Sequence, residues 1–345
     1  MKGLLALLLI AASLCLAGPA WATATCTATA NPTRPFNNVN SGAAAPSTGT
    51  LNITVNCTTA ALSLLATTGV RVCVGIGAGS GGGTPASGRT MTTSSGDSLN
   101  FQIYNNASYS QATGLLPRGT PPAQELTMTY NVPLLTGGSG AQTTQLFAQI
   151  PANQTLASGN YSSSFSGANV VLTWAWNEVL LGNATVPATC NGGATGTNSA
   201  SAAFSFTATA TVLPQCGSYV TTAMNFGNVT GSIAANIDQT ARLTLTCLKN
   251  TAYQVSLDNG QNNPTGTSTR RMRTTVAGSN YYLGYELYRD AGRSQRWGNT
   301  LTVDTVGGVG TGAAQQLTIY GRVPPVAGQP PAGTYSDVIN VTITY

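Results

Sequence analysis

The sequence predicts an all-β protein made of two immunoglobulin-like antiparallel β-sandwich domains, the C-terminal one lacking its last strand. Three observations support this prediction. Apolar and polar residues alternate along most of the chain, a long pattern of residues occurs twice, and the cysteines are even in number once a leader is removed. We expect a signal peptide over 1–22, a surface-binding domain over 23–200 and a second domain over 201–345.

The alternation is that of strands with one buried face. The runs 51–56 and 243–246 alternate Leu, Ile or Val with Asn or Thr, while Gly, Pro, Asn and Ser gather between such runs. We expect no helix of ten residues after the leader. Antiparallel sandwiches are the architecture that this pattern favours.

An internal duplication sets the number of domains. The interval between Cys26 and Cys57 equals the interval between Cys216 and Cys247. Further matches follow in the same order: 36–39 with 226–229, 99–107 with 283–291, 145–151 with 316–324, and 159–161 with 333–335. So many matches in one order indicate two copies of one domain.

The N-terminus and the cysteines indicate export. Lys2, an apolar run over 4–16 and the small residue Ala22 have the order of a secretory signal peptide. Of seven cysteines, Cys15 lies in this leader, and the remaining even number indicates disulfides formed in an oxidising compartment. The duplication gives Cys26–Cys57 and Cys216–Cys247 as the repeated bridge, which leaves Cys73 to pair with Cys190.

The composition argues against several classes of function. The chain has 14 Lys and Arg, nine Asp and Glu, and no histidine, which excludes His-based catalytic triads and most zinc sites. The carboxylates are scattered singly, so we expect no enzyme, no cofactor and no metal. Charge is scarce between 23 and 200. Arg270, Arg271 and Arg273 form a basic cluster that we interpret as an ordinary solvated hairpin, not as a nucleic-acid site.

Motifs of the second half resemble the spore coat protein U domain, which pilins of the archaic, Csu-type chaperone–usher pathway contain. They are the Cys216 and Cys247 pair, 225–227 (NFG), 287–290 (LYRD) and 333–337 (GTYSD). The resemblance extends over nearly all of 201–345 and, more loosely, over 24–190. A two-domain member of this family is similar to the tip adhesin of a pilus. The resemblance implies export through the periplasm to the cell surface, with a periplasmic chaperone, an outer-membrane usher and an adjacent pilin subunit as partners.

The last predicted strand is expected to border an open groove. Ile339, Val341, Ile343 and Tyr345 alternate with polar residues, and an immunoglobulin-like sheet has one more strand beside them. In the family this place is filled by a strand of the chaperone and later by the N-terminal segment of the next pilin. Because only 23–25 precede Cys26 in the mature chain, we expect the subunit to accept a strand and not to donate one.

A donor-like strand occurs inside the chain, just before Cys216. Its apolar residues alternate with Ser and Thr; they are Phe204, Phe206, Ala208, Ala210 and Val212. We hypothesise that this strand completes the first domain in cis. The alternative, which the sequence favours equally, makes it the first strand of the second domain.

The first domain contains three insertions relative to the second. Each carries adjacent apolar residues between turn residues: Leu62, Leu64 and Leu65; Leu115 and Leu116; Val179, Leu180 and Leu181. Exposed apolar patches mark interaction sites, so we hypothesise that the three loops bind an abiotic or host surface. The alternative is that these residues cover an enlarged core.

Other functions remain open at this stage. Trp174 and Trp176 share the parity of the apolar residues of their strand, which favours core packing over carbohydrate stacking in a sugar-binding tip. Trp297 near Arg293 is either a surface cation–π pair or part of the core rim. A structural pilin or coat subunit is the third possibility.

Overall fold

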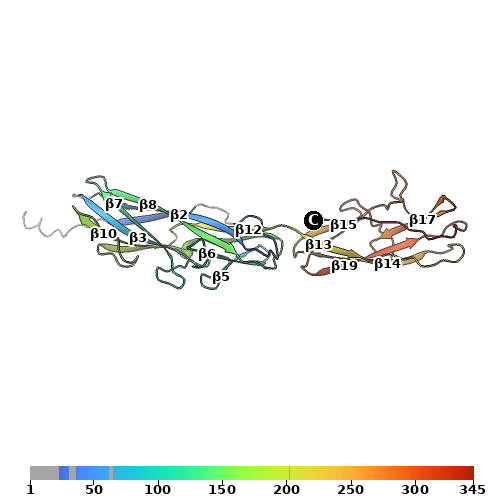
Figure 1. Ribbon diagram of the computed structural model, residues 1–345, viewed down its shortest axis with the longest axis horizontal. Helices are drawn as coiled ribbons and strands as arrows, with labels where there is room; N and C mark the ends of the chain where they lie inside the picture. The colour runs from blue at the N-terminus through green and yellow to red at the C-terminus, as the bar shows by residue number, and fades with distance from the viewer. Residues whose placement is uncertain (1–22, 31–35, 62–64, 202) are drawn as a thin grey trace, which may run out of the picture. The chain divides into compact units, whose positions relative to one another are not determined.

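The computed structural model describes residues 23–30, 36–61, 65–201 and 203–345 (Figure 1), and the expected signal peptide over 1–22 lies outside them. Apart from the 3-10 turn η1 (Gly167–Asn169), the regular structure of these residues is all β, as predicted. None of the described residues forms a helix long and apolar enough to span a membrane. The chain divides into two compact units, one extending to Thr155 with Asn160–Thr211, the other containing Leu156–Gly159 and Val212–Tyr345.

The first unit is an antiparallel sandwich. Its strands are β1 (Ala24–Ala30), β2 (Ser47–Thr59), β3 (Ala66–Ile76), β4 (Gly83–Thr84), β5 (Gly88–Thr92), β6 (Ser98–Tyr104), β7 (Gln124–Val132), β8 (Gly138–Ile150), β9 (Gly159–Phe165), β10 (Val170–Leu180), β11 (Gly196–Ser201) and β12 (Phe206–Val212). One sheet has the order β1-β2-β8-β6-β5-β9-β12, with β4 beside β5, and the other has the order β11-β10-β3-β7.

The second unit repeats this plan with fewer strands. They are β13 (Cys216–Thr221), β14 (Ile237–Cys247), β15 (Ala252–Leu257), β16 (Arg270–Val276), β17 (Ser279–Tyr288), β18 (Val306–Val309), β19 (Ala314–Val323) and β20 (Val341–Thr344). The sheets have the orders β13-β14-β19-β17-β16 and β18-β15-β20. The first is the A-B-E-D order of an immunoglobulin-like sandwich, and the second contains C and F. Among the described residues of this unit, no strand pairs with the outer edge of β20.

The duplicated strands have the same register in both units. β2 pairs with β8 so that Ser47 lies opposite Ile150, and β14 pairs with β19 so that Ile237 lies opposite Val323. Along β2 every second residue from Leu51 to Cys57 is buried, which is the period of two that the sequence predicts for a strand with one face on the core.

The repeated disulfide joins the first two strands of each unit. Cys26 is bonded to Cys57 and Cys216 to Cys247, with the same sequence separation of 31 residues. The Cys73–Cys190 bridge occurs in the first unit alone and ties β3 to the segment between β10 and β11. On the loop-entropy view, whose mechanism is disputed, a bridge of such separation stabilises a domain by roughly 3 to 5 kcal/mol.

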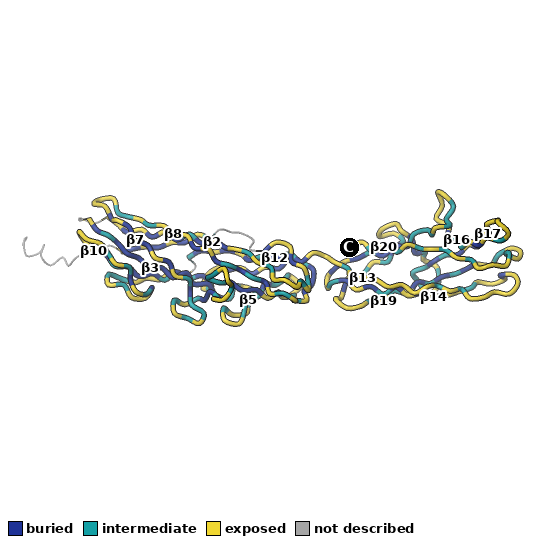
Figure 2. Tube along the Cα trace, viewed as in Figure 1, coloured by how far each residue is buried: buried dark blue, intermediate teal, exposed yellow. Residues whose placement is uncertain are grey.

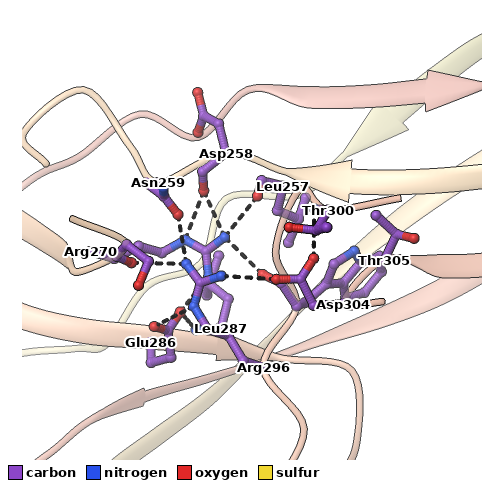
Figure 3. A network of polar contacts seen from close by, with 12 residues as sticks. Leu257, Asp258, Asn259, Arg270, Glu286, Leu287, Arg296, Thr300, Asp304 and Thr305 are labelled. Carbon is purple, nitrogen blue, oxygen red and sulfur yellow. Dashed lines mark hydrogen bonds and ion pairs between the residues drawn. The ribbon is translucent and has the colours of Figure 1, made fainter. Parts of the chain in front are cut away.

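A buried arginine occupies the same place in both units. In the second unit Arg270 is fully buried and donates hydrogen bonds to the carbonyl oxygens of Leu257 (2.9 Å), Asp258 (2.6 Å) and Trp297 (2.8 Å), and it forms an ion pair with Glu286 (Figure 3). The interpretation of this arginine as part of a solvated hairpin is therefore wrong. It faces inward, where it supplies donors to three carbonyl oxygens of the core.

Arg89 holds the corresponding carbonyl groups of the first unit. Its guanidinium is fully buried and donates to Gly77 (2.7 Å), Ile76 (2.8 Å) and Thr113 (2.7 Å), with Gln102 standing where the second unit has its glutamate. Equivalent residues of the two units therefore form equivalent hydrogen-bond networks, as expected of a duplicated domain. The change from glutamate to glutamine also illustrates how few charges the first unit contains.

Candidate functional site

The donor-like segment forms β12 and closes the first unit. Its neighbour in the sheet is β9, and Thr211 Oγ1 donates to Asn160 Oδ1 (2.9 Å) while the hydroxyls of Ser164 and Thr207 lie 3.5 Å apart. Because residue numbers rise along β9 as they fall along β12 in these contacts, the two strands are antiparallel. β12 up to Thr211 therefore belongs to the first unit, as the hypothesis of completion in cis requires.

The inward face of β12 fills the end of the first core. Phe204, Phe206, Ala208, Ala210 and Val212 are all buried. The ring of Phe206 is stacked on that of Phe165 with 4.4 Å between the centroids. On its other side β12 runs parallel to the segment after β1, where the amide of Val39 donates to the carbonyl of Thr211 (2.8 Å). The strand thus lies between β9 and the segment 36–39.

The same place in the second unit is an open apolar groove, here called the acceptor groove. Its volume is about 370 Å³, and its lining includes Phe226, Ala241, Tyr285, Tyr335, Ile339 and Val341. The duplication matches Phe226 to Phe36 and Tyr335 to Tyr161, which flank β12 in the first unit. No described residue of the second unit occupies the position of β12.

Equivalent side chains are therefore buried in one unit and uncovered in the other. Val39 is 3% exposed, whereas its counterpart Val229 is 48% exposed. Phe36 is likewise buried and Phe226 half-buried. These pairs share their sequence context, and Val39 contacts β12 while no described strand lies beside Val229, so we attribute the difference in exposure to the presence of β12 in one unit.

The edge strands of the acceptor groove show the same contrast (Figure 2). Along β1 of the first unit every second residue is buried, but β13 has no buried residue on either face. On the opposite side Ile339, Val341 and Ile343 are half-buried and their polar neighbours are exposed, while Tyr345 is 56% exposed. A sheet edge of this kind is a template for a further strand.

One carboxylate lies in the wall of the acceptor groove. Asp337 Oδ2 accepts a hydrogen bond from the Tyr285 hydroxyl (2.8 Å), and Oδ1 accepts from the amide (3.2 Å) and side-chain Nδ2 (3.0 Å) of Asn262. Burial, together with the hydrogen bond to Asp337 and the charge of that group, raises the pKa of Tyr285 far above its ordinary value. The phenol therefore stays protonated, and remains a hydrogen-bond donor to Asp337, at pH values at which an exposed tyrosine would already ionise.

Stability should depend on this phenol at alkaline pH. Because its pKa is raised in the folded chain, Tyr285 contributes stability that is fully present below about pH 10, the pKa of an unfolded tyrosine, and lost as pH rises further. Between pH 10 and 11.5 the free energy of unfolding of the wild type should fall with pH more steeply than that of the Tyr285→Phe variant. We expect the two slopes to differ by about 1 kcal/mol per pH unit. Urea unfolding at several pH values measures this slope. The exposed Tyr282→Phe variant is the control, and equal slopes for both variants would contradict the assignment.

A second candidate site is an exposed apolar cluster at one end of the first unit. Leu180 lies opposite Ala66 on β3, and the amide of Leu181 donates to the carbonyl of Leu65 (2.9 Å). The β7–β8 turn lies at the same end, because Val132 also pairs with Ala66. The exposed leucines here are Leu65, Leu134, Leu135, Leu180 and Leu181, and we call them the apolar tip cluster.

The apolar tip cluster differs in part from the expected loops. Val179 lies beside it and is 37% exposed, whereas Leu62 and Leu64 lie outside the described residues. Leu115 is half-buried and Leu116 exposed, but the carbonyl of Leu115 lies against Gly75, near the other end of β3. At 3.3 Å per residue, Gly75 is about 30 Å from Ala66 along the strand. The structure therefore does not bring the second expected loop to the other two.

The β7–β8 turn supplies the leucines that sequence reasoning missed. Leu135 and Leu181 are the most exposed large apolar residues of those described, at 78% and 74%. Both have backbone φ angles in the left-handed region, 69° and 53°, which leucine rarely adopts. Adjacent leucines followed by Gly137 and Gly138 were the available signal, because they place two large apolar side chains beside a tight turn.

The three tryptophans among the described residues belong to the core and offer no stacking surface. Trp174 is 2% exposed and its indole donates to the carbonyl of Ala24 (2.8 Å), and Trp176 is also buried. Trp297 is 1% exposed and donates to the carbonyl of Val255 (2.9 Å). The core interpretation of Trp174 and Trp176 is confirmed. Trp297 is also buried in the core, so the surface cation–π alternative for it is wrong.

Both units are thus immunoglobulin-like sandwiches, one closed by its own strand and one with an open groove. The sequence profile of the Spore Coat Protein U domain matches residues 11–167 and 202–342, which together are most of the chain. The chain belongs to the spore coat protein U domain family. Protein U of Myxococcus xanthus is 33% identical over 132 residues, which are 35% of this chain and 71% of that protein.

Two solved structures match nearly the whole chain at low sequence identity. One is the CsuC–CsuE chaperone–tip adhesion subunit pre-assembly complex of the archaic chaperone–usher Csu pili of Acinetobacter baumannii. It has 18% identity and a TM-score of 0.41, covering 94% of this chain and 100% of the matched chain. Another is the CupB6 tip adhesin of Pseudomonas aeruginosa, with 12% identity, a TM-score of 0.33 and 94% of each chain covered.

Proposed function

We propose that this chain is the adhesive tip subunit of a chaperone–usher pilus. Its second unit accepts a β-strand from another protein in the acceptor groove, and its first unit attaches the cell to an abiotic or host surface through the apolar tip cluster. The partners are a periplasmic chaperone during export, an outer-membrane usher, and an adjacent pilin subunit that donates the strand in the fibre.

The observation that carries the proposal is that one duplicated domain occurs both with and without its closing strand. β12 buries the core end of the first unit, and about 370 Å³ of apolar groove stands open at the same place in the second. A protein that exposes an uncovered sheet edge and an apolar groove is prone to aggregate during export. A strand added in trans removes the hazard, and it supplies main-chain hydrogen bonds for affinity and pockets for alternate side chains.

The apolar tip cluster supports the attachment part of the proposal. Leucines at 74% and 78% exposure in left-handed backbone are unfavourable for the stability of the isolated domain, and contact with something outside the domain would account for them. Burial of roughly 100 Å² on each leucine would yield about 2 to 3 kcal/mol. Such weak single contacts become firm attachment when many pili on one cell engage together.

Co-purification from the periplasm tests the acceptor role. The full chain, expressed with a chaperone of an archaic chaperone–usher operon, should be isolated as a one-to-one complex. The Val341→Asp variant places a charge on the groove face, so the yield of the chaperone complex should fall by about tenfold or more. Thr342→Asp, one residue along on the exposed face of β20, is the matched control and should retain it.

The two variants separate groove binding from a general loss of solubility. Equal recovery of the complex from both, or recovery of a soluble chaperone-free chain with a stably folded second unit, would contradict the proposal.

A further inference from the structure

The closed first unit is a template for the strand that the open second unit takes up. We infer that this incoming strand carries a large apolar residue opposite Ile339 and a small hydrogen-bond donor, serine or threonine, opposite Asp337, and that it excludes an acidic residue there. This inference rests on the proposed acceptor function. It names the chemistry of the partner strand.

The register of β12 on β9 fixes which positions matter. The contacts of Asn160 with Thr211 and of Ser164 with Thr207 place Ala208 opposite Ser163 and Phe206 opposite Phe165. Counting from the matched tyrosines 161 and 335 gives the equivalents in the second unit. Asp337 stands where the first unit has a serine, and Ile339 stands where it has a phenylalanine.

The groove residues around Ile339 are smaller than their counterparts in the first unit. In the first unit the stacked rings of Phe165 and Phe206 fill this end of the core. An isoleucine in place of one ring removes half of that stack. The wall at Ala241 is also smaller than at its counterpart Leu51, since β2 and β14 share one register. An incoming strand must therefore bring an aromatic or long aliphatic side chain here to exclude water.

The pocket beside Asp337 contains a carboxylate, whereas its counterpart in the first unit contains the uncharged hydroxyl of Ser163. Ser163 is fully buried, accepts a hydrogen bond from the amide of Gly81 (3.0 Å) and faces the methyl group of Ala208. Asp337 has three hydrogen-bond donors from its own unit, and a carboxylate has about four acceptor positions. A hydroxyl on the incoming strand can donate to the remaining acceptor position. A carboxylate there would be repelled by Asp337, because the incoming strand displaces water from the groove and the two negative charges are then poorly screened.

Binding of labelled peptides to the full chain tests the inference. The parent peptide is 204–213, the chain's own closing strand, and its variants are Ala208→Ser, Ala208→Asp and Phe206→Ala. We expect Ala208→Ser to bind at least as tightly as the parent. The other two variants should bind about tenfold or more weakly by fluorescence polarisation.

An Asp337→Ser host supplies the matched control. It restores the residue of the first unit, so the deficit of the Ala208→Asp peptide should shrink to about threefold or less while the parent still binds. A deficit of the same size in both hosts, or equal binding of all four peptides to the wild type, would overturn the inferred pattern and leave the acceptor function standing. Failure of every peptide to bind either host would overturn the acceptor function as well.

Discussion

Replacing Phe206 with alanine is expected to lower the free energy of unfolding of the first unit by about 3 to 5 kcal/mol. The phenylalanine is buried, and its ring is stacked on that of Phe165. Its removal leaves a cavity at the core end and weakens the hold of β12 on β9. Chemical denaturation of the full chain, followed by the fluorescence of Trp174 and Trp176, measures the loss.

The outward face of the same strand provides the control. Thr207→Ala removes an exposed side chain beside Phe206 and should change the unfolding free energy by less than about 0.5 kcal/mol. A matched comparison comes from the second unit, where Ile339→Ala truncates a half-buried residue and should cost less than truncation of its counterpart Phe165. If Phe206→Ala and Thr207→Ala had equal effects, β12 would not be the closing strand of the first core.

The double variant Leu135→Ser, Leu181→Ser is expected to reduce attachment of pilus-bearing cells to polystyrene by about tenfold or more. Each leucine offers roughly 100 Å² of apolar surface to a substratum, and avidity multiplies the loss over many pili. Both side chains are exposed, so the substitutions should leave the unfolding free energy nearly unchanged. Crystal-violet staining of attached cells, with surface pili quantified by immunoblot, measures the effect.

Leu116→Ser is the matched control for attachment. Leu116 is 63% exposed but lies toward the other end of β3 from the apolar tip cluster. Its substitution should leave attachment within about twofold of the wild type. Loss of attachment in Leu116→Ser, with the double variant unaffected, would move the binding surface to the 114–119 loop. Inhibition of the wild type by free sugars and not by mild detergent would favour a carbohydrate receptor instead.

The fold was predictable because local and repeated signals agree. Alternation along β2 gives a strand with one buried face, and the equal cysteine intervals give two copies with the same first bridge. The assignment of β12 was not decided by this reasoning. Its alternating pattern suits a closing strand of one unit as well as an opening strand of the next, and only its pairing with β9 separates these cases.

The candidate sites were less predictable, since they depend on which loops meet in space. Insertions at 115–116 and 179–181 look alike in sequence, yet Leu115 lies against Gly75 near one end of β3, whereas Leu180 lies opposite Ala66 at the other end. The leucines of the β7–β8 turn were not predicted, because they lie in a short connection between two strands and not in an insertion with its own run of apolar residues. Arg270 was misjudged for a similar reason. A run of arginines indicates exposure to solvent, and the sequence does not show that the carbonyl oxygens of Leu257 and Trp297 accept hydrogen bonds from one of them in the core.

The scarcity of charge in the first unit has a consequence for where adhesion can operate. One arginine is sealed in the core, and Arg71 is already paired with Glu125 at 2.7 Å. Acid, alkali and brine act on a protein through groups that titrate or gather counter-ions. A surface of leucine, threonine, serine and asparagine gives them little to act on. Attachment through this surface is expected to persist at salt concentrations and pH values at which binding through ion pairs would be lost.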